Sequence, residues 1–503
     1  MSYPVQTIAR VIGARVLQMP RPEAEVAHLL LDSRQVVFPR SSLFFALQGR
    51  RLDGHDFVQE AWQQGVRHFV VERLPANAAL PEATILQVPD ALAALQRLAA
   101  WHRSHFDLPV VGITGSNGKT IVKEWLYQLL HPFVQVVRNP RSYNSQSGVP
   151  LSVWQLGPGH ELALFEAGIS RKGEMERLAA IIRPTIGLFT NLGPAHDEGF
   201  ADRQEKLQEK LQLFETAAVI VACRDQEEVW AALQARFADR RLFGWSRTDA
   251  GADMRVVREE VQGQRTLLTV QLQGHELELE VPFADRASVE NALHCLAVCA
   301  VLGRATPEVV ARFARLEPVA MRLELKEGVQ QCLVVNDSYN SDLGSLAIAL
   351  QFLEQQGNRP RRTLILSDIL QSGRDAEVLY CDVARLVAGH GIDRFIGVGR
   401  AVRATAPHLP KGMDTAFFDT TEALLAAIDA GRLAFANEAV LIKGARDFAF
   451  ERVANRLARK VHNTVLEVHL GALVHNLSVF SKYLEPGVRT MAMVKAAAYG
   501  SGG

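Results

Sequence analysis

The sequence lacks the features that mark disulfide-rich, zinc-binding, secreted and membrane-spanning proteins. Its 503 residues include only five cysteines, at 223, 295, 299, 332 and 381, and no C-x-x-C pair. No apolar run approaches the roughly 18 residues of a membrane-spanning helix, and the N-terminus has no basic segment followed by an apolar core. We therefore expect reduced thiols in a cytoplasmic protein without stable membrane insertion.

An excess of charge of either sign is also absent. Lysine plus arginine and aspartate plus glutamate each number 55, which leaves no net charge to hold a phosphate backbone, so nucleic acid is not an expected partner. Hydrophobic residues make up 48% and charged residues 22%, as in globular proteins. The length predicts roughly three domains of about 150 residues each.

The order of the apolar patterns predicts an α/β fold. Residues 1–107 are expected to form a small α/β domain, residues 108–316 a central mostly parallel sheet, and residues 317–460 a third α/β domain. Strict alternation over residues 263–283 predicts an antiparallel hairpin that turns near Gly274. Residues 461–503 are too few to bury a core alone, so they pack on the rest, stay loose, or begin something that is missing.

The strongest local signal is GITGSNGKT, from Gly112 to Thr120, between a strand pattern and a helix pattern. Backbone N–H groups at such a helix start can hold phosphates, Lys119 can reach the β and γ oxygens, and Thr120 can bind Mg²⁺. Five residues rather than four separate Gly112 from Gly118, so the strict Walker pattern fails at Ile113. A ligand-free glycine turn remains the alternative, and ATP binding alone leaves a kinase, a motor or a ligase open.

Two further polar residues follow apolar strand patterns. Glu166 ends ELALFEAG, at the carboxyl end where α/β sheets place ligands, and is either a magnesium carboxylate or a solvated strand-end residue. His196 lies in TNLGPAHDEGF, where a lone loop histidine is either structural or a ligand.

Six segments resemble the Mur ligases in order and approximate spacing. They are TGSNGKT, YNSQSGVPLS, FEAG, TNLGPAHDEGF, DSYNSD and LIKGAR. The N-terminal DSRQV and LFFALQGRRLDGHDF segments resemble the UDP-sugar-binding domain of that family. The resemblance covers about residues 25–458. It implies a UDP-substrate domain, a central ATP-binding phosphate-loop domain and a Rossmann-like C-terminal domain, with a monomeric ligase part.

The family branch that this chain most resembles joins D-alanyl-D-alanine to UDP-N-acetylmuramoyl-tripeptide in peptidoglycan precursor synthesis. The resemblance implies that ATP converts the tripeptide carboxylate into an acyl phosphate, which the dipeptide amine attacks. Such phosphoryl transfer needs positioning and charge neutralisation rather than a protein nucleophile. Three alternatives remain: the branch that adds the third residue, whose D-N-P-R signature we do not find, a folylpolyglutamate-synthase-like ligase, and an ATP-binding protein without turnover.

The resemblance also implies roles for individual residues. Those with catalytic roles are Lys119, His196, Lys210 and Arg322. Those that would bind the nucleotide are Gly115, Ser116, Asn117, Gly118, Lys119, Thr120, Asn291, Arg322, Asp337 and Asn340. Those that would bind the two substrates are Asp32, Ser33, Arg34, Asp53, Gly54, His55, Asn144, Lys443 and Arg446. Those that would hold two Mg²⁺ ions are Thr120, Glu166, His196 and Lys210.

Some of these positions have other interpretations, and some segments depart from the family pattern. The resemblance implies that Lys210 carries a carbamate formed with CO₂, whereas by itself it reads as a solvated lysine beside Lys206 and Glu209. Arg322 could instead form a structural salt bridge, and the segments around Asp32 and Asp53 read alone as two polar turns. The departures are Ala287 and Ser288 in place of His-Asn, and Gln371 and Ser372 after the weaker candidate Asp368.

The last segment resembles the opening of alanine racemase. In MAMVKAAAYGSGG, Lys495 matches the lysine that binds pyridoxal phosphate, and Tyr499 matches the tyrosine near the cofactor phosphate. A racemase barrel needs about 250 residues, far more than follow residue 460. We therefore expect a truncated fusion without racemase activity, in which pyridoxal phosphate belongs only to the missing half.

Overall fold

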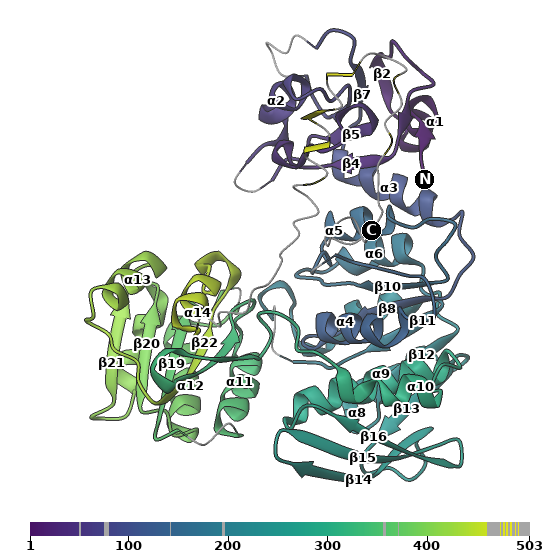
Figure 1. Cartoon of the computed structure of the whole chain (residues 1–503). Helices are drawn as coiled ribbons and strands as arrows, with labels where there is room; N and C mark the ends of the chain where they lie inside the picture. The colour runs from purple at the N-terminus through teal and green to yellow at the C-terminus, as the bar shows by residue number, and fades with distance from the viewer. Residues whose placement is uncertain are drawn as a thin grey trace. The chain divides into compact units, whose positions relative to one another are not determined.

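The computed structural model describes residues 1–49, 52–74, 80–140, 142–193, 197–355, 359–370, 372–459 and single residues between 473 and 491. The candidates His196, Lys495 and Tyr499, and the departure at Gln371, lie outside the described residues. One compact unit contains residues 1–101 and another contains residues 102–460 (Figure 1). Among the helices described, none has the length and apolar character needed to cross a membrane.

The first unit contains a five-stranded sheet of order β2-β7-β6-β5-β4, in which β2 is antiparallel and the other strands are parallel. Its strands are β2 (Arg15–Gln18), β4 (His28–Leu30), β5 (Ser42–Phe45), β6 (His68–Val71) and β7 (Thr84–Gln87), beside the short pair β1 (Tyr3–Pro4) and β3 (Glu25–Val26). Its helices are α1 (Val5–Ile12), α2 (Val58–Gln63) and α3 (Ala91–Arg103), which leads out of the unit. Strands β5 and β6 are buried along their whole length, which explains why apolar residues follow Ser42 and His68 in them.

The second unit begins with a nine-stranded sheet of order β16-β15-β14-β13-β12-β11-β8-β10-β9. Its strands are β8 (Val110–Thr114), β9 (Val136–Arg138), β10 (Leu162–Glu166), β11 (Ile186–Phe189), β12 (Val219–Cys223), β13 (Arg241–Ser246), β14 (Met254–Gln262), β15 (Arg265–Leu272) and β16 (His275–Val281). Its helices are α4 (Lys119–Leu130), α5 (Gly148–Val153), α6 (Glu174–Ile182), α7 (Arg203–Leu211), α8 (Glu227–Arg236), α9 (Arg286–Val301) and α10 (Pro307–Ala311). Helices α4 and α9 pack against each other, and their apolar residues share one hydrophobic core with those of this sheet (Figure 1).

The predicted hairpin is confirmed, but it is part of a larger antiparallel meander. Strands β15 and β16 pair antiparallel around Gly274, whose φ of +85° suits glycine. Strand β14 precedes them and pairs antiparallel with β15, and it joins the parallel part of the sheet through β13. Strand β14 was not predicted, because its mostly exposed part, VREEVQ over residues 257–262, carries mixed charges that hide the alternation.

The second unit continues with a six-stranded sheet of order β17-β18-β22-β19-β20-β21, parallel except for β17. Its strands are β17 (Glu324–Glu327), β18 (Leu333–Asp337), β19 (Arg361–Ser367), β20 (Arg394–Val398), β21 (Asp414–Phe418) and β22 (Glu438–Lys443). Its helices are α11 (Leu343–Gln355), α12 (Ala376–Gly389), α13 (Thr421–Asp429) and α14 (Glu451–Leu457). The expected α/β class with mostly parallel sheets is confirmed.

The register of the nine-stranded sheet brings candidate residues to one edge. Strand β8 lies between β10 and β11, with Glu166 opposite Ile113 and Phe189 opposite Thr114. Because the three strands are parallel, the segments that follow them all leave from the same edge. The GITGSNGKT segment, from Gly112 to Thr120, is called the phosphate loop below. It is therefore a neighbour of the FEAG and TNLG segments, at the edge where open α/β sheets bind ligands.

Candidate functional site

The phosphate loop connects β8 to α4, as the sequence predicts. Gly115 and Gly118 adopt positive φ angles of 144° and 81°. A Cβ on Gly115 would lie 2.0 Å from the Thr190 hydroxyl, so only glycine fits there. No side chain caps the N-terminus of α4, which leaves the N–H groups of its first turn available to an anion.

The segment after β11 fastens this loop. The Ser116 N–H donates to the carbonyl oxygen of Asn191 at 2.8 Å, and the Asn117 N–H donates to the Asn191 side-chain oxygen at 3.0 Å. The Thr190 hydroxyl donates to the Asn117 carbonyl at 2.6 Å. Sequence reasoning missed Thr190 and Asn191, although both stand in the TNLGPAHDEGF segment, directly after the apolar strand.

Lys119 points back onto the loop that precedes it. Its ammonium donates to the carbonyl oxygens of Gly115 and Ser116, each at 2.8 Å. Burial lowers the pKa of Lys119 to about 8, and the nearby Glu166 carboxylate opposes that shift. The side chain thus lies on the loop that would hold the phosphates, and it remains mostly protonated at neutral pH.

Glu166 is a buried carboxylate at the end of β10. Its side chain is inaccessible to solvent, and within the described residues neither carboxylate oxygen has a hydrogen-bond donor. Its own N–H is held by the side-chain oxygen of Asn139 at 2.7 Å, which fixes the backbone at this point. A buried carboxylate that accepts no hydrogen bond is costly, so these two oxygens fit a cation. The alternative of a solvated strand-end residue is wrong.

Two other expected magnesium ligands lie near the same edge. Thr120 is buried, with its hydroxyl 3.4 Å from that of Ser142. Lys210, on α7, donates to the carbonyl of Gly115 at 3.1 Å and is only 2% exposed, so it is not a solvated lysine. Within the described ranges no three His, Cys, Asp or Glu side chains form a metal cluster, and the expected set contains a single carboxylate, that of Glu166.

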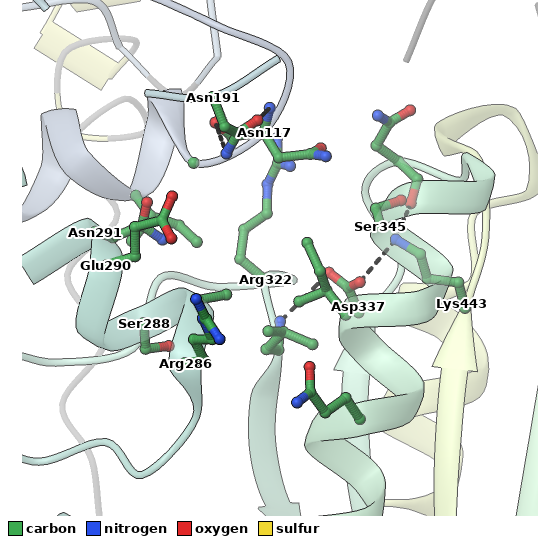
Figure 2. A pocket seen from close by; sticks show the side chains of 17 residues that line it. Asn117, Asn191, Arg286, Ser288, Glu290, Asn291, Arg322, Asp337, Ser345 and Lys443 are labelled. Carbon is green, nitrogen blue, oxygen red and sulfur yellow. Dashed lines mark hydrogen bonds and ion pairs between the residues drawn. The ribbon is translucent and has the colours of Figure 1, made fainter. Parts of the chain in front are cut away.

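A cavity of about 200 Å³ joins the phosphate loop to the segment around β18 (Figure 2). The sequence-predicted residues that line it are Asn117, Gly118, Asn291, Arg322, Asp337, Asn340 and Lys443. A Cβ on Gly118 would lie 2.4 Å from the side-chain oxygen of Asn291, so helix α9 touches the loop directly. Ala287 and Ser288, where the family pattern fails, also line the cavity. Six of the ten nucleotide candidates, from distant segments, thus meet around one space together with the substrate candidate Lys443.

Two wall residues of this cavity form a buried ion pair. The Lys443 ammonium lies 2.7 Å from a carboxylate oxygen of Asp337 and also donates to the Asn340 carbonyl. The Lys443 side chain is 1% exposed. Its contacts are therefore with Asp337 and Asn340, which it holds in place.

Arg322 lies between the two walls of the cavity in Figure 2. It also lines a second cavity of about 720 Å³, together with Thr120, Arg138 and Arg446. Its guanidinium lies 4.3 Å from the ring centre of Tyr339, and that of Arg446 lies 5.8 Å from the same ring. Within the described residues Arg322 forms no ion pair, which excludes the structural salt bridge there.

Asn144 lies beside the FEAG segment. Its carbonyl accepts the N–H of Gly168 at 2.9 Å, and a Cβ on Gly168 would lie 3.0 Å from its side-chain amide. Asp368, the weaker candidate, accepts the N–H groups of Val402 at 2.8 Å and Arg400 at 3.2 Å. Its carboxylate therefore supports the turn before the short helix at 401–408.

In the first unit, Asp32 to Arg34 form a local motif. The Asp32 carboxylate accepts the Arg34 N–H at 3.0 Å and pairs with its guanidinium at 2.7 Å, while Ser33 is buried between them in the chain. The Arg34 side chain is 81% exposed, so it can still meet a ligand.

The Asp53 to His55 turn is more tightly bonded. Asp53 accepts the N–H of His55 at 3.0 Å and contacts its Nδ1 at 2.6 Å, and it also pairs with Arg73. The N–H of Glu72 donates to Nε2 of His55, which places the imidazole proton on Nδ1. These hydrogen bonds, first that of the His55 N–H, lower the pKa of Asp53 to about 2. Gly54 fits because a Cβ there would lie 2.7 Å from the backbone of Leu47.

The chain matches family models and curated relatives over most of its length. Residues 113–299 match the model of the Mur ligase middle domain, and residues 25–103 match that of the Mur ligase family, catalytic domain. A UDP-N-acetylmuramoyl-tripeptide–D-alanyl-D-alanine ligase of Escherichia coli is 30% identical over 422 residues, covering 82% of this chain and 90% of that protein. The ligase of the same description from Bacillus subtilis is 28% identical and covers 79% and 85%.

Solved structures show the same fold. A crystal structure of MurF from Acinetobacter baumannii superposes with a TM-score of 0.79 at 24% identity, covering 91% of this chain and 99% of that one. MurF ligase from Thermotoga maritima in complex with ADP superposes with a TM-score of 0.70 at 23% identity, covering 86% and 96%.

Proposed function

This chain belongs to the Mur ligase family of ATP-dependent ligases, and we propose that it joins D-alanyl-D-alanine to UDP-N-acetylmuramoyl-tripeptide in peptidoglycan precursor synthesis. The names of relatives that match about four fifths of the chain support this substrate pair. The observation that carries the chemistry is Glu166, a fully buried carboxylate that accepts no hydrogen bond from the part of the chain that the structure describes, at the edge that also holds the phosphate loop.

In the proposed reaction, the γ-phosphoryl group of ATP moves to the tripeptide carboxylate, and the dipeptide amine then displaces phosphate from the acyl phosphate. The protein must neutralise phosphate charge and align the reactants. The N-terminus of α4 and the ammonium of Lys119 would bind the phosphates. Arg322 would approach them from the opposite wall of the cavity, where its guanidinium has no carboxylate partner among the described residues.

Magnesium fits the residues that are described. Glu166 offers two unpaired oxygens and Thr120 a buried hydroxyl, and we propose that His196 and Lys210 complete two sites. A carbamate on Lys210 would replace a buried cation by an anion, which suits a metal-binding role. The ions would supply neutralisation of phosphate charge.

The first unit would bind the uridine part of the substrate through Asp32, Ser33, Arg34, Asp53, Gly54 and His55. The exposed guanidinium of Arg34 supports a contact with a ligand, whereas Asp53 and His55 would shape the turn that carries it. We assign Asn144 and Arg446 to substrate contacts near the phosphate loop, and Lys443 to the support of Asp337. Because the proposed reaction consumes ATP and a nucleotide-linked precursor, we expect a cytoplasmic enzyme with a monomeric ligase part. The racemase-like segment, with Lys495, stays a prediction.

Phosphate release tests the proposal. The complete chain is incubated with ATP, Mg²⁺, UDP-N-acetylmuramoyl-tripeptide and D-alanyl-D-alanine, and each component is omitted in turn. The proposal expects release only when all four are present. Release that requires a free diamino acid and the dipeptide precursor would assign the chain to another branch of the family, and no release with any acceptor would contradict enzymatic turnover.

A further inference from the structure

Arg322 lines two cavities, and the larger one, of about 720 Å³, has Tyr339 in its wall. It is called the Tyr339 cavity below. Its volume lies within the range of about 300–1,000 Å³ that is typical of small-molecule sites. Thr120, the last residue of the phosphate loop, also lines it. A ligand in the Tyr339 cavity would therefore lie beside the place where we expect the phosphates.

The walls of the Tyr339 cavity combine apolar surface with a few polar groups. Residues 318–321, with the sequence PVAM, contribute apolar side chains, and Tyr143 and Tyr339 contribute two phenol rings. Two carboxylates, those of Glu124 and Glu451, and three guanidinium groups also line the cavity. Such a mixture suits a small ligand that carries both charged ends and methyl groups.

The three guanidinium groups differ in what they already contact. That of Arg138 is engaged, because its Nε donates to the Glu124 carboxylate at 2.9 Å. That of Arg322 lines the nucleotide cavity as well, and we have assigned it to the phosphates. That of Arg446 makes no hydrogen bond or ion pair with the described residues, and it lies 5.8 Å from the ring centre of Tyr339. Arg446 is therefore the arginine of this cavity that is available to an anionic ligand.

The backbone that carries Arg446 is held at both ends. Arg446 begins a short 3-10 helix, Arg446–Phe448, directly after β22. The N–H of Ala445 donates to the Ser367 hydroxyl at 2.9 Å, and the Thr421 hydroxyl donates to the Phe448 carbonyl at 2.6 Å. The side chain is exposed, so it is open to a ligand, but the fold fixes the point from which it extends. This placement distinguishes it from an arginine on a loose surface loop.

The acceptor of the proposed reaction has matching chemistry. D-alanyl-D-alanine has an amine at one end, a carboxylate at the other and two methyl groups between them. When its amine reaches the acyl phosphate, its carboxylate lies about 7 Å away, the length of two extended residues. A guanidinium binds a carboxylate through two parallel hydrogen bonds. Arg322 and Arg446 lie 4.3 and 5.8 Å from the centre of the same Tyr339 ring, so one cavity holds a group for the phosphate side and another for the carboxylate side.

We propose that the Tyr339 cavity binds the acceptor dipeptide and that Arg446 holds its free carboxylate. The inference rests on the proposed ligase reaction, and it names the substrate and the chemical group that Arg446 contacts. It requires the enzyme to recognise its acceptor by the carboxylate, whereas a structural role of Arg446 does not.

Two acceptors that differ only in this group test the inference. Phosphate release by the complete chain is measured at saturating ATP and UDP-N-acetylmuramoyl-tripeptide, with either D-alanyl-D-alanine or D-alanyl-D-alaninamide, to give kcat/KM for each acceptor. The proteins are wild type, Arg446→Met and Arg403→Met. Arg403→Met is the matched control, because Arg403 is 48% exposed and lies 5.9 Å from the Phe417 ring of the same sheet, but does not line the cavity.

Wild type should prefer the dipeptide to its amide by about tenfold to a hundredfold in kcat/KM, the size of a hydrogen bond to a charged group. Arg446→Met should lose this preference through a higher KM for the dipeptide and should use the amide as wild type does, whereas Arg403→Met should keep the preference. The ratio between acceptors does not depend on how much of a preparation is folded.

Three results would overturn the inference. They are a wild type that does not distinguish the two acceptors, an Arg446→Met variant that loses activity equally with both, and one that keeps the preference while its KM for the UDP-linked substrate rises. The last result would assign Arg446 to the tripeptide instead. If wild type released no phosphate with either acceptor, the proposed function itself would be wrong.

Discussion

Two fully buried glutamates stand in opposite surroundings. Glu438, at the start of β22 in the C-terminal sheet, is 1% exposed and pairs with Arg394 at 2.9 Å. It also accepts the Thr363 hydroxyl and the N–H of Ala436. Glu166, at the end of β10, is equally buried, and no donor among the described residues reaches either of its oxygens.

Glu438 has the surroundings of a structural charge, and Glu166 has those that we expect of a ligand-binding one. The burial of Glu438 needs no ligand, because Arg394, Thr363 and Ala436 supply its ion pair and hydrogen bonds. The described residues give the Glu166 oxygens no hydrogen bond, which fits the ligand site that we propose there. Burial alone does not distinguish the two glutamates. The lack of hydrogen-bond donors to the Glu166 oxygens, among the described residues, does, and it indicates a ligand site.

The same substitution at both positions tests this, beginning with the larger expected effect on stability. Glu438→Gln should lower the free energy of unfolding by about 3–5 kcal/mol, because the Arg394 guanidinium would remain buried without its counter-charge. Urea unfolding measures the change. Asp414→Asn, which breaks the exposed pair with Arg361, is the control and should change the free energy by about 0.5 kcal/mol or less. Equal losses in Glu438→Gln and Asp414→Asn would show that the buried pair with Arg394 matters no more to stability than the exposed pair with Arg361.

Glu166→Gln should have the opposite pattern. Removal of a buried charge that accepts no hydrogen bond from the described residues should leave the free energy of unfolding unchanged or raise it. Phosphate release with the complete set of substrates should fall about a hundredfold to a thousandfold, as expected when one group that stabilises developing charge is lost. Thermal unfolding and phosphate release measured on the same preparation check both parts. A destabilised variant that keeps its activity would make Glu166 a structural residue.

Asp53→Asn should lower the free energy of unfolding less than Glu438→Gln does. The pKa of this carboxyl is lowered to about 2, so its contribution to stability is present above the unfolded pKa near 4 and is lost as the pH falls towards 2. Since the group is close to the surface, we expect a loss of about 1 kcal/mol at pH 7. Urea unfolding of wild type and variant at pH 7 and at pH 3 measures this difference, which should shrink at the lower pH. A difference independent of pH would assign the effect to the shape of the turn.

The sequence predicted the parts of the site that depend on local pattern. The strand, glycine turn and helix from Val110 to Leu130 follow from apolar spacing and two glycines, and the hairpin at Gly274 follows from strict alternation. The resemblance to the Mur ligases also indicated Asn291, Arg322 and Asp337 as nucleotide-binding residues, and all three line one cavity in the structure.

Tertiary contacts explain what pattern reasoning could not see. Helix α7 has the composition of a solvated helix, and only its packing against the loop reveals that Lys206 and Lys210 are buried. Asn191 binds the loop through its side chain and its carbonyl, a role that no spacing rule predicts. Tyr339 lies beside two arginines from segments more than one hundred residues apart.

The bonds from Asn191 to the phosphate loop have a consequence for the entropy of binding. Two N–H groups of the loop, those of Ser116 and Asn117, are already engaged by protein atoms. The loop conformation is thereby selected when the chain folds, so a nucleotide that arrives later meets a preorganised cradle. Association then loses little free energy to immobilising the backbone, and more of the attraction between phosphate and protein is expressed as affinity.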